Sequence, residues 1–139
     1  MMLLYYRPNH FKLEELIPPE TWQALGRKAW LVLDPRALFT LDQLREAFGV
    51  CIVNTWHEGG MLKYRGFRPP ECKVGAHYSQ HRFGRGFDCT FRQSSEIVRQ
   101  TIMEHRDQFP YLTTLESDVS WVHFDIRDHG GEDIELVHP

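Results

Sequence analysis

A strict alternation over the seven residues from Trp121 to Arg127, WVHFDIR, is the strongest constraint on what this chain can fold into. Successive side chains of a β-strand point to opposite faces. The apolar side chains would share one face and the others the opposite face: Val122, Phe124 and Ile126 against Trp121, His123, Asp125 and Arg127. The segment therefore predicts a sheet with its core on one side and polar groups, lining a cleft, on the other.

The remaining elements follow from local patterns. YLTTLE (111–116) and the polar turn 117–120 predict a hairpin with the alternating segment, and further strands are expected at 50–55 and 87–91. Capping residues and apolar spacing predict helices that start at Pro18-Pro19, at Asp34 and at Ser94 or Ser95. Too few βαβ units occur for a doubly wound sheet, so we expect an α+β fold with a mainly antiparallel sheet and helices packed on one face.

Length and composition limit the function classes. The 139 residues predict one domain, 1–139, and 42% hydrophobic with 25% charged residues is typical of a globular protein. A net charge of −3 gives no support for a nucleic-acid partner, and the absence of a long apolar run argues against a membrane span. The first residues lack the features of an export signal. The cysteines, Cys51, Cys72 and Cys89, are expected to be reduced thiols.

Three residues are candidates for a metal site. His81 and Asp88 are separated by a turn that contains Gly84 and Gly86, so an imidazole and a carboxylate could converge. His123 lies on the polar face of its strand and could complete the set. Two histidines and one carboxylate leave one position of a tetrahedral zinc ion open, which is the catalytic arrangement. The alternative is that these three are ordinary polar residues.

Two motifs resemble those of a known family. Ser79-x-His81-x-x-Gly84-x-Gly86-x-Asp88 is similar to the S-x-H-x-x-G-x-A-x-D signature of the zinc D-alanyl-D-alanine carboxypeptidases and L-alanyl-D-glutamate endopeptidases. Trp121-Val122-His123-Phe124-Asp125 is similar to their second motif, W-x-H-x-D. FKLEEL near the start resembles the short versions found in bacteriophages and prophages. The two motifs occur in the family's order.

The resemblance implies a hedgehog/DD-peptidase fold, zinc bound by His81, Asp88 and His123, and the stem peptide of peptidoglycan as substrate. Asp125 and Ser79 would then support the ligands from behind. Without an export signal, the chain would reach the cell wall after lysis, with a phage particle or with a partner. The oligomeric state and the bond that is cleaved stay open.

The chain departs from the family at the position of the general base. Carboxypeptidase members carry Glu or Asp where this chain has Ser120, and a serine cannot act as the base at neutral pH. If the hairpin turn has two or four residues, Glu116 pairs with Trp121 and shares the face of His123. Glu116 is therefore the first candidate for the base and Asp118, in the turn, the second. The exchange of Ala for Gly86 should preserve close packing.

Arg65 and Arg68, in KYRGFR, are candidates for binding substrate, because a guanidinium can hold a carboxylate with two hydrogen bonds. Either could equally be a solvated loop charge.

Two other functions remain open. Ser120 favours a binding or structural protein that keeps zinc but lacks catalysis. The other is a non-haem iron site, since His123 and Asp125 form an H-x-D pair; it ranks last because it needs a second histidine downstream, and only His129 and His138 follow.

Overall fold

The computed structural model describes residues 4–139, so the first three residues of the segment tested for an export signal lie outside the described part. The α-helices in this part are α1 (Pro19–Leu25), α2 (Pro35–Phe48) and α3 (Ser95–Glu104). The strands are β1 (Cys51–Ile52), β2 (Gly86–Phe91), β3 (Thr114–Glu116), β4 (Val122–Asp125) and β5 (Glu135–Val137). The fold is therefore α+β, as expected. None of these helices is long and apolar enough to cross a membrane.

The strands form one sheet in the order β1-β2-β4-β3-β5. β1, β2, β4 and β3 pair antiparallel, whereas β5 pairs parallel to β3. The sheet is thus mixed, and the expectation of a mainly antiparallel sheet was wrong. The reason is β5, a short and mostly exposed strand whose pattern is too brief to predict, which returns beside β3 after a loop.

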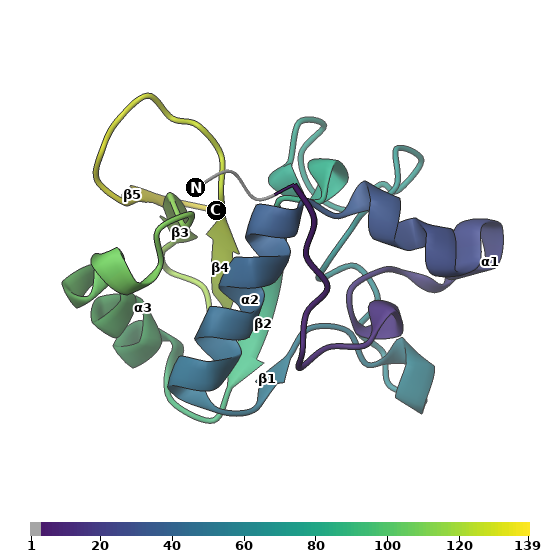
Figure 1. Ribbon diagram of the computed structural model, residues 1–139, viewed down its shortest axis with the longest axis horizontal. Helices are drawn as coiled ribbons and strands as arrows, with labels where there is room; N and C mark the ends of the chain where they lie inside the picture. Colours follow the sequence, from purple (N-terminus) through teal and green to yellow (C-terminus); the bar gives the residue numbers. More distant parts are fainter. Residues whose placement is uncertain (1–3) are drawn as a thin grey trace.

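The apolar face of the sheet forms the core. Val122 and Phe124 of β4 are fully buried, as the alternation predicted, and Ile126 is 7% exposed. They belong to one apolar cluster with Phe87 of β2 and with the leucines of α2, Leu38, Leu41 and Leu44. In Figure 1, α2 lies across the front of β2 and β4. Cys51, Cys72 and Cys89 are free and buried, as expected for reduced thiols.

α2 forms where its caps predicted. The Asp34 side chain accepts a hydrogen bond from the Arg36 amide at 2.9 Å, Pro35 occupies the first helical position, and the helix ends at Gly49, whose φ is 85°. Its amphipathic pattern lets it cover the sheet.

The strand expected at 50–55 is shorter, Cys51–Ile52, because Asn54 leaves the sheet to bind the N-terminal third of the chain. Its amide donates to the Glu15 carbonyl at 3.0 Å, and its side chain donates to the Ile17 carbonyl at 3.3 Å. These bonds fix the N-terminal third against the segment that leads to the polar face of the sheet.

Candidate metal centre

The metal-binding candidates come from three separate elements. Asp88 lies on β2 and His123 on β4, and the antiparallel register sets them directly opposite one another. His81 lies on a short 3-10 helix, Gln80–Phe83, whose first turn is capped by Ser79: its hydroxyl accepts from the His81 amide at 3.3 Å. Gly84 ends this helix with a φ of 67°, and a side chain there would collide with the Val32 carbonyl, so only glycine allows the turn that aims His81 at the sheet.

The three side chains meet at one carboxylate oxygen. Asp88 Oδ1 lies 2.8 Å from His123 Nδ1 and 3.2 Å from His81 Nε2. One possible ligand atom from each of the three residues lies within 4.8 Å of those of the other two. The predicted trio is therefore close enough to bind a metal ion.

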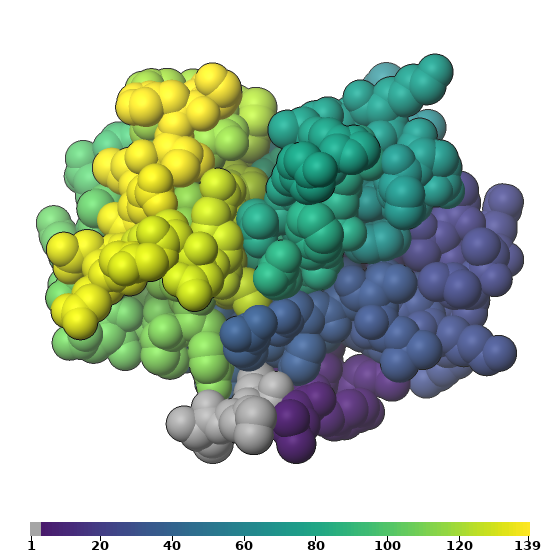
Figure 2. Space-filling view, turned by 90° about the horizontal axis from the view of Figure 1, so that it is seen from above, coloured from purple at the N-terminus to yellow at the C-terminus, as the bar shows by residue number. Residues whose placement is uncertain are grey.

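The polar face of the sheet is covered here, not open as expected. His81 is 3% exposed, Asp88 7% and His123 5%. The segment 65–84 provides the cover, and it joins β2 through the Asp88 amide, which donates to the Arg65 carbonyl at 2.8 Å. Figure 2 shows residues around 75–90 (teal) beside the C-terminal residues (yellow). The cluster thus lies beneath the surface, where charges interact strongly.

Each histidine is oriented by a partner behind it. His81 Nδ1 lies 2.8 Å from the Gly66 carbonyl, which assigns the proton to Nδ1 and leaves Nε2 free as a ligand. His123 Nε2 lies 2.7 Å from Asp125 Oδ2, which leaves Nδ1 facing Asp88. Asp125 is in turn held by the Arg127 guanidinium through two bonds, at 2.8 and 2.5 Å. Asp125 therefore lies at the Nε2 edge of the His123 ring, away from Asp88, and its supporting role stays a prediction.

Burial and charge act in opposite directions on these groups. Burial would lower the pKa of His123, but the carboxylates of Asp125 and Asp88 outweigh it and raise that pKa to about 9. Burial would raise the pKa of Asp88, but hydrogen bonds from His123 and His81 hold it well below its usual range. Burial dominates at His81 and lowers its pKa. A protonated His123 can donate one N–H to each carboxylate, Nδ1 to Asp88 and Nε2 to Asp125.

The donor set and the space around it fit a transition metal. Two imidazoles and one carboxylate are a donor set that zinc accepts. Each of the three side chains also contacts a further polar group, as metal ligands in proteins usually do. Gly86 lies opposite Asp125, and a Cβ there would be 3.3 Å from Asp125 Cβ and 3.4 Å from His123 Cε1. The small residue in the family-like motif is therefore needed to let the ligand and its partner approach.

Glu116 shares the face of His123, although the register differs from the expected one. Thr114 pairs with Asp125 and Leu115 with Phe124, so the same register sets Glu116 opposite His123 and not opposite Trp121. The pairing of the two strands is shifted by two residues from the expected one. Because side chains alternate with a period of two, this shift keeps Glu116 on the face that was expected. Glu116 is half-buried, and its charge acts on both Arg68 and Arg127.

Asp118 lies apart from the cluster. It is exposed in the turn with a φ of 61°, and its carboxylate lies 2.9 Å from His138 Nδ1. Of the two candidates for the base, Glu116 is the one on the strand position opposite His123.

The two arginines differ in environment. Arg68 is largely buried: its Nη2 lies 3.4 Å from Asp88 Oδ2, and its Nε donates to the Tyr64 carbonyl at 2.7 Å. Burial lowers the pKa of Arg68, while Asp88 and Glu116 act to raise it. Arg65 lies over the Trp121 ring, with its guanidinium carbon 5.2 Å from the ring centroid.

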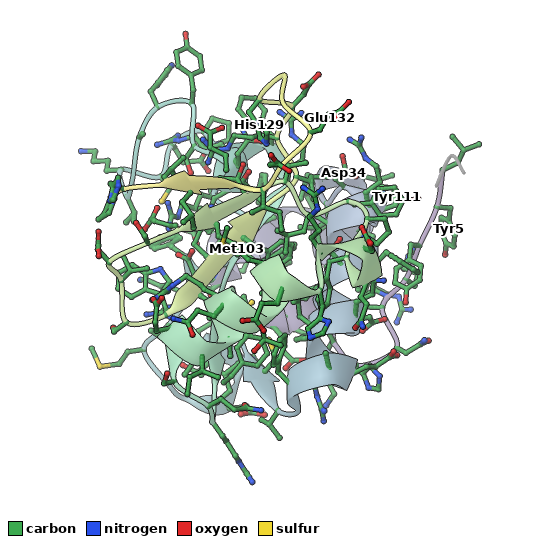
Figure 3. All side chains as sticks on the ribbon, turned by 90° about the vertical axis from the view of Figure 1, so that its left-hand side faces the viewer. Tyr5, Asp34, Met103, Tyr111, His129 and Glu132 are labelled. Atoms are coloured by element: carbon green, nitrogen blue, oxygen red, sulfur yellow. The ribbon has the colours of Figure 1, made fainter. Side chains whose placement is uncertain are left out.

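Neither downstream histidine lies beside His123 and Asp125, as an H-x-D iron site would need. His129, on the loop between β4 and β5 (Figure 3), binds the Thr113 carbonyl at 3.1 Å, and His138 binds Asp118. Neither joins the His81–Asp88–His123 group.

Sequence reasoning missed two residues that matter to the site. Arg127 was placed on the polar face but not recognised as the partner of Asp125, although two residues on one strand face are neighbours. The Gly66 carbonyl that orients His81 carries no sequence signal, because it comes from irregular backbone.

Comparisons with protein-family models, with curated proteins and with solved structures find no match for this chain. The case for a function therefore rests on the residues and geometry of the site.

Proposed function

We propose that this protein is a zinc-dependent peptidase that hydrolyses peptide bonds in the stem peptides of bacterial peptidoglycan, on a fold of the hedgehog/DD-peptidase type. The observation that carries the proposal is the buried His81–Asp88–His123 group with the carboxylate residue Glu116 opposite His123 on the same face of the sheet. A buried metal-binding group beside a carboxylate on another strand is the basic requirement of a zinc hydrolase. Both family-like motifs coincide with this group.

Zinc, when bound by these three residues, would supply Lewis-acid activation of a peptide carbonyl and of water. The chain's own residues would transfer the proton and orient the two imidazoles. Glu116 takes the proton of the attacking water and returns it to the leaving amine, a role that needs a carboxylate in reach of the site. Asp125 and the Gly66 carbonyl hold the two imidazoles in the orientation that presents Nδ1 of His123 and Nε2 of His81.

Arg68 provides fixed positive charge beside the ligand Asp88. A buried guanidinium next to the reacting carbonyl stabilises negative charge that develops there, and it can hold a peptide carboxylate. The cleavage would be of the carboxypeptidase or the endopeptidase type. The protein would reach the cell wall after lysis or by phage delivery.

The test measures zinc and hydrolysis together. Purified protein is loaded with zinc, and its hydrolysis of synthetic stem peptides is followed by mass spectrometry for the parent chain, Glu116→Gln and Asp118→Asn. We expect Glu116→Gln to keep its zinc and lose about 100-fold or more in rate, because the amide keeps the size but not the basicity. Asp118→Asn is the matched control and should retain the parent rate, since Asp118 faces His138.

A second candidate function is a noncatalytic zinc-binding phage structural or binding protein of the same fold. Ser120 favours this function, because it puts no carboxylate at the usual place of the base. Its backbone carbonyl accepts a hydrogen bond from the Ser95 hydroxyl at 2.7 Å. Zinc binding with no hydrolysis of any stem peptide by the parent chain would select this function. Equal loss in Asp118→Asn would move the base to the turn.

A further inference from the structure

A hollow of about 230 Å³ lies among the short helices of the N-terminal third. It is formed by α1 and by two 3-10 helices, Leu13–Glu15 and Gly26–Val32. Its lining residues are Lys12, Leu13, Glu14, Trp22, Arg27 and Trp30. In Figure 2 the N-terminal residues (purple) and the residues around 75–90 (teal) lie on opposite sides of the view. The hollow shares no residue with the metal centre and is therefore separate from the proposed peptidase site.

Two indole rings form the apolar part of this hollow. Trp22, on α1, and Trp30, on the second of these 3-10 helices, are half-buried and pack against the apolar core. Neither indole N–H donates a hydrogen bond to a residue of the range 4–139. The Trp56 indole, in contrast, donates to the Ile17 carbonyl at 2.8 Å. Trp22 and Trp30 therefore offer a ligand both flat apolar surface and unused N–H donors.

The charged side chains that line the hollow form no ion pair with any residue that the structure describes. Lys12 and Arg27 are exposed, and Glu14 is half-buried. The ammonium and the guanidinium are donors, and the carboxylate is an acceptor. The hollow thus combines apolar rings with polar groups of both kinds that the protein itself does not use.

A second hollow, of about 190 Å³, adjoins the first and shares Trp30 with it. The segment 4–7 lines its other side, where the Arg7 guanidinium carbon lies 4.7 Å from the centroid of the Trp30 ring. Tyr5 and Leu31 in this lining are 69% and 87% exposed. Two adjoining hollows that meet at one indole suit two neighbouring units of a polymer.

This combination matches a sugar ring. A pyranose has C–H groups on its faces, which pack on an indole, and hydroxyl groups around its edge, which need both donors and acceptors. Pockets for drug-sized ligands have about 300 Å³ or more, so the smaller hollow at Trp22 suits one ring. A phosphate-rich surface, of a lipid or a nucleic acid, is less suited, because it would face the unpaired Glu14 and a protein of net charge −3.

We propose that the hollows at Trp22 and Trp30 bind the glycan strand of peptidoglycan, a polymer of N-acetylated amino sugars, and anchor the enzyme on the cell wall. The inference rests on the proposed peptidase function and names a second part of the same polymer as ligand. Because the hollows are separate from the metal centre, a bound glycan strand raises the local concentration of stem peptides without touching the reaction.

The binding experiment uses a soluble probe, the β-1,4-linked tetramer of N-acetylglucosamine, and follows the indole N–H signals of the four tryptophans by NMR. We expect the tetramer to shift the signals of Trp22 and Trp30 with a Kd of about 0.1 to 1 mM, and to leave those of Trp56 and Trp121 unchanged. Absence of shifts at Trp22 and Trp30 would overturn the inference.

Variants test which side chains carry the binding. Trp30→Leu should weaken tetramer binding about 5-fold or more, because it removes the shared ring and its donor. Since Trp30 packs against the core, Arg27→Ala is the second variant, at an exposed position, and should weaken binding about 3-fold. Tyr78→Ala removes an aromatic side chain that is 78% exposed elsewhere on the surface, and this matched control should bind as the parent does.

Hydrolysis by the zinc-loaded proteins separates anchoring from catalysis. Trp30→Leu and Arg27→Ala should keep the zinc content and the rate on soluble stem peptides, but lose about 5-fold and 3-fold in rate on insoluble peptidoglycan. Parent rates of both variants on the insoluble wall would overturn the anchoring role, while hydrolysis of the soluble peptides would leave the peptidase function standing.

If the parent protein hydrolyses no stem peptide, the peptidase function fails, and cosedimentation with insoluble peptidoglycan decides the glycan site. Cosedimentation that Trp30→Leu weakens and Tyr78→Ala does not would support a glycan site in a noncatalytic protein. Self-association of the parent that Trp30→Leu abolishes, without binding of the tetramer, would overturn the inference and identify the hollows as an interface between copies of this chain.

Discussion

The buried guanidinium of Arg99, in α3, donates to the backbone carbonyl of Trp121 at 2.9 Å and to that of Val119 at 3.2 Å. The Ser95 hydroxyl at the start of α3 donates to the neighbouring Ser120 carbonyl at 2.7 Å. One helix thus holds the turn that connects Glu116 to His123. The position of this turn and of Trp121, on which Arg65 stacks, therefore depends on Arg99, a residue that is not part of the His81–Asp88–His123 group.

Replacing Arg99 by Met should release this turn. Methionine fills much of the volume but leaves the Val119 and Trp121 carbonyls without their donor, so the free energy of unfolding should fall by about 2 kcal/mol or more. Urea denaturation measures the change. Arg92→Met, at an exposed position, should change the free energy by less than about 0.5 kcal/mol. Equal stability of the two variants would show that the turn does not need Arg99.

The metal ligands should be separable from the other histidines by zinc content. Replacing His123, His81 or Asp88 by Ala should reduce bound zinc from about one ion per chain to a small fraction, because a site with three protein ligands loses most of its affinity with one of them. Element analysis after dialysis gives the content. His77→Ala, an exposed histidine, should bind as the parent does. Full zinc retention in His123→Ala would contradict the assignment.

Residue size at Gly86 should control the geometry of His123. Alanine places its Cβ 3.3 Å from Asp125 Cβ and 3.4 Å from His123 Cε1, which small shifts can relieve, but valine adds two methyl groups in the same space. We expect Gly86→Ala to keep nearly all zinc affinity and Gly86→Val to lose about 10-fold or more, comparable to the loss of a ligand's supporting partner. Competition with a chelator measures both. Full affinity in the valine variant would mean that this contact is unimportant.

The Asp34 cap of α2, labelled in Figure 3, should make stability depend on pH at the acid end. Burial tends to raise the pKa of Asp34, but hydrogen bonds from Arg36 outweigh it, so the pKa is lower in the folded than in the unfolded chain. The contribution is therefore complete above the unfolded pKa and is lost as pH falls through the folded one. At pH 7, Asp34→Ala should cost about 1 kcal/mol, the usual value of an N-cap.

Urea denaturation of parent and Asp34→Ala at several pH values checks this prediction. The difference in unfolding free energy between the two should shrink as pH falls to the ordinary aspartate pKa of 3.8 and below it. A difference that is constant down to the lowest pH would show that the ionised carboxylate is not what caps α2.

Period-two patterns account for what could be predicted of the sheet. Alternation in WVHFDIR placed Val122 and Phe124 in the core and His123 on the polar face, and both placements are confirmed. The hairpin register was wrong by two residues, yet Glu116 kept its face, because an even displacement preserves side-chain direction. The face on which a side chain lies is thus easier to predict than the residue it pairs with on the next strand.

The cover over the polar face could not be predicted in the same way. Residues 65–84 have no hydrophobic period, and their position depends on single contacts such as the Gly66 carbonyl with His81 and the Arg65 carbonyl with Asp88. These are backbone acceptors, whose partners the residue types do not indicate. The expected open cleft is therefore a buried cluster, and β5 escaped prediction because three residues carry too little pattern.

The strand order β1-β2-β4-β3-β5 also determines when the metal centre can form as the chain folds. Only β3 and β4 are joined by a short turn, whereas Asp88 on β2 and His123 on β4 are 35 residues apart in the chain. Long-range pairing has to overcome the entropy of closing a large loop, so we expect β2 to dock after the local hairpin has formed. If the proposed zinc binds there, we expect it to bind late in folding: it would slow unfolding of the folded protein and leave the rate of folding nearly independent of the zinc concentration.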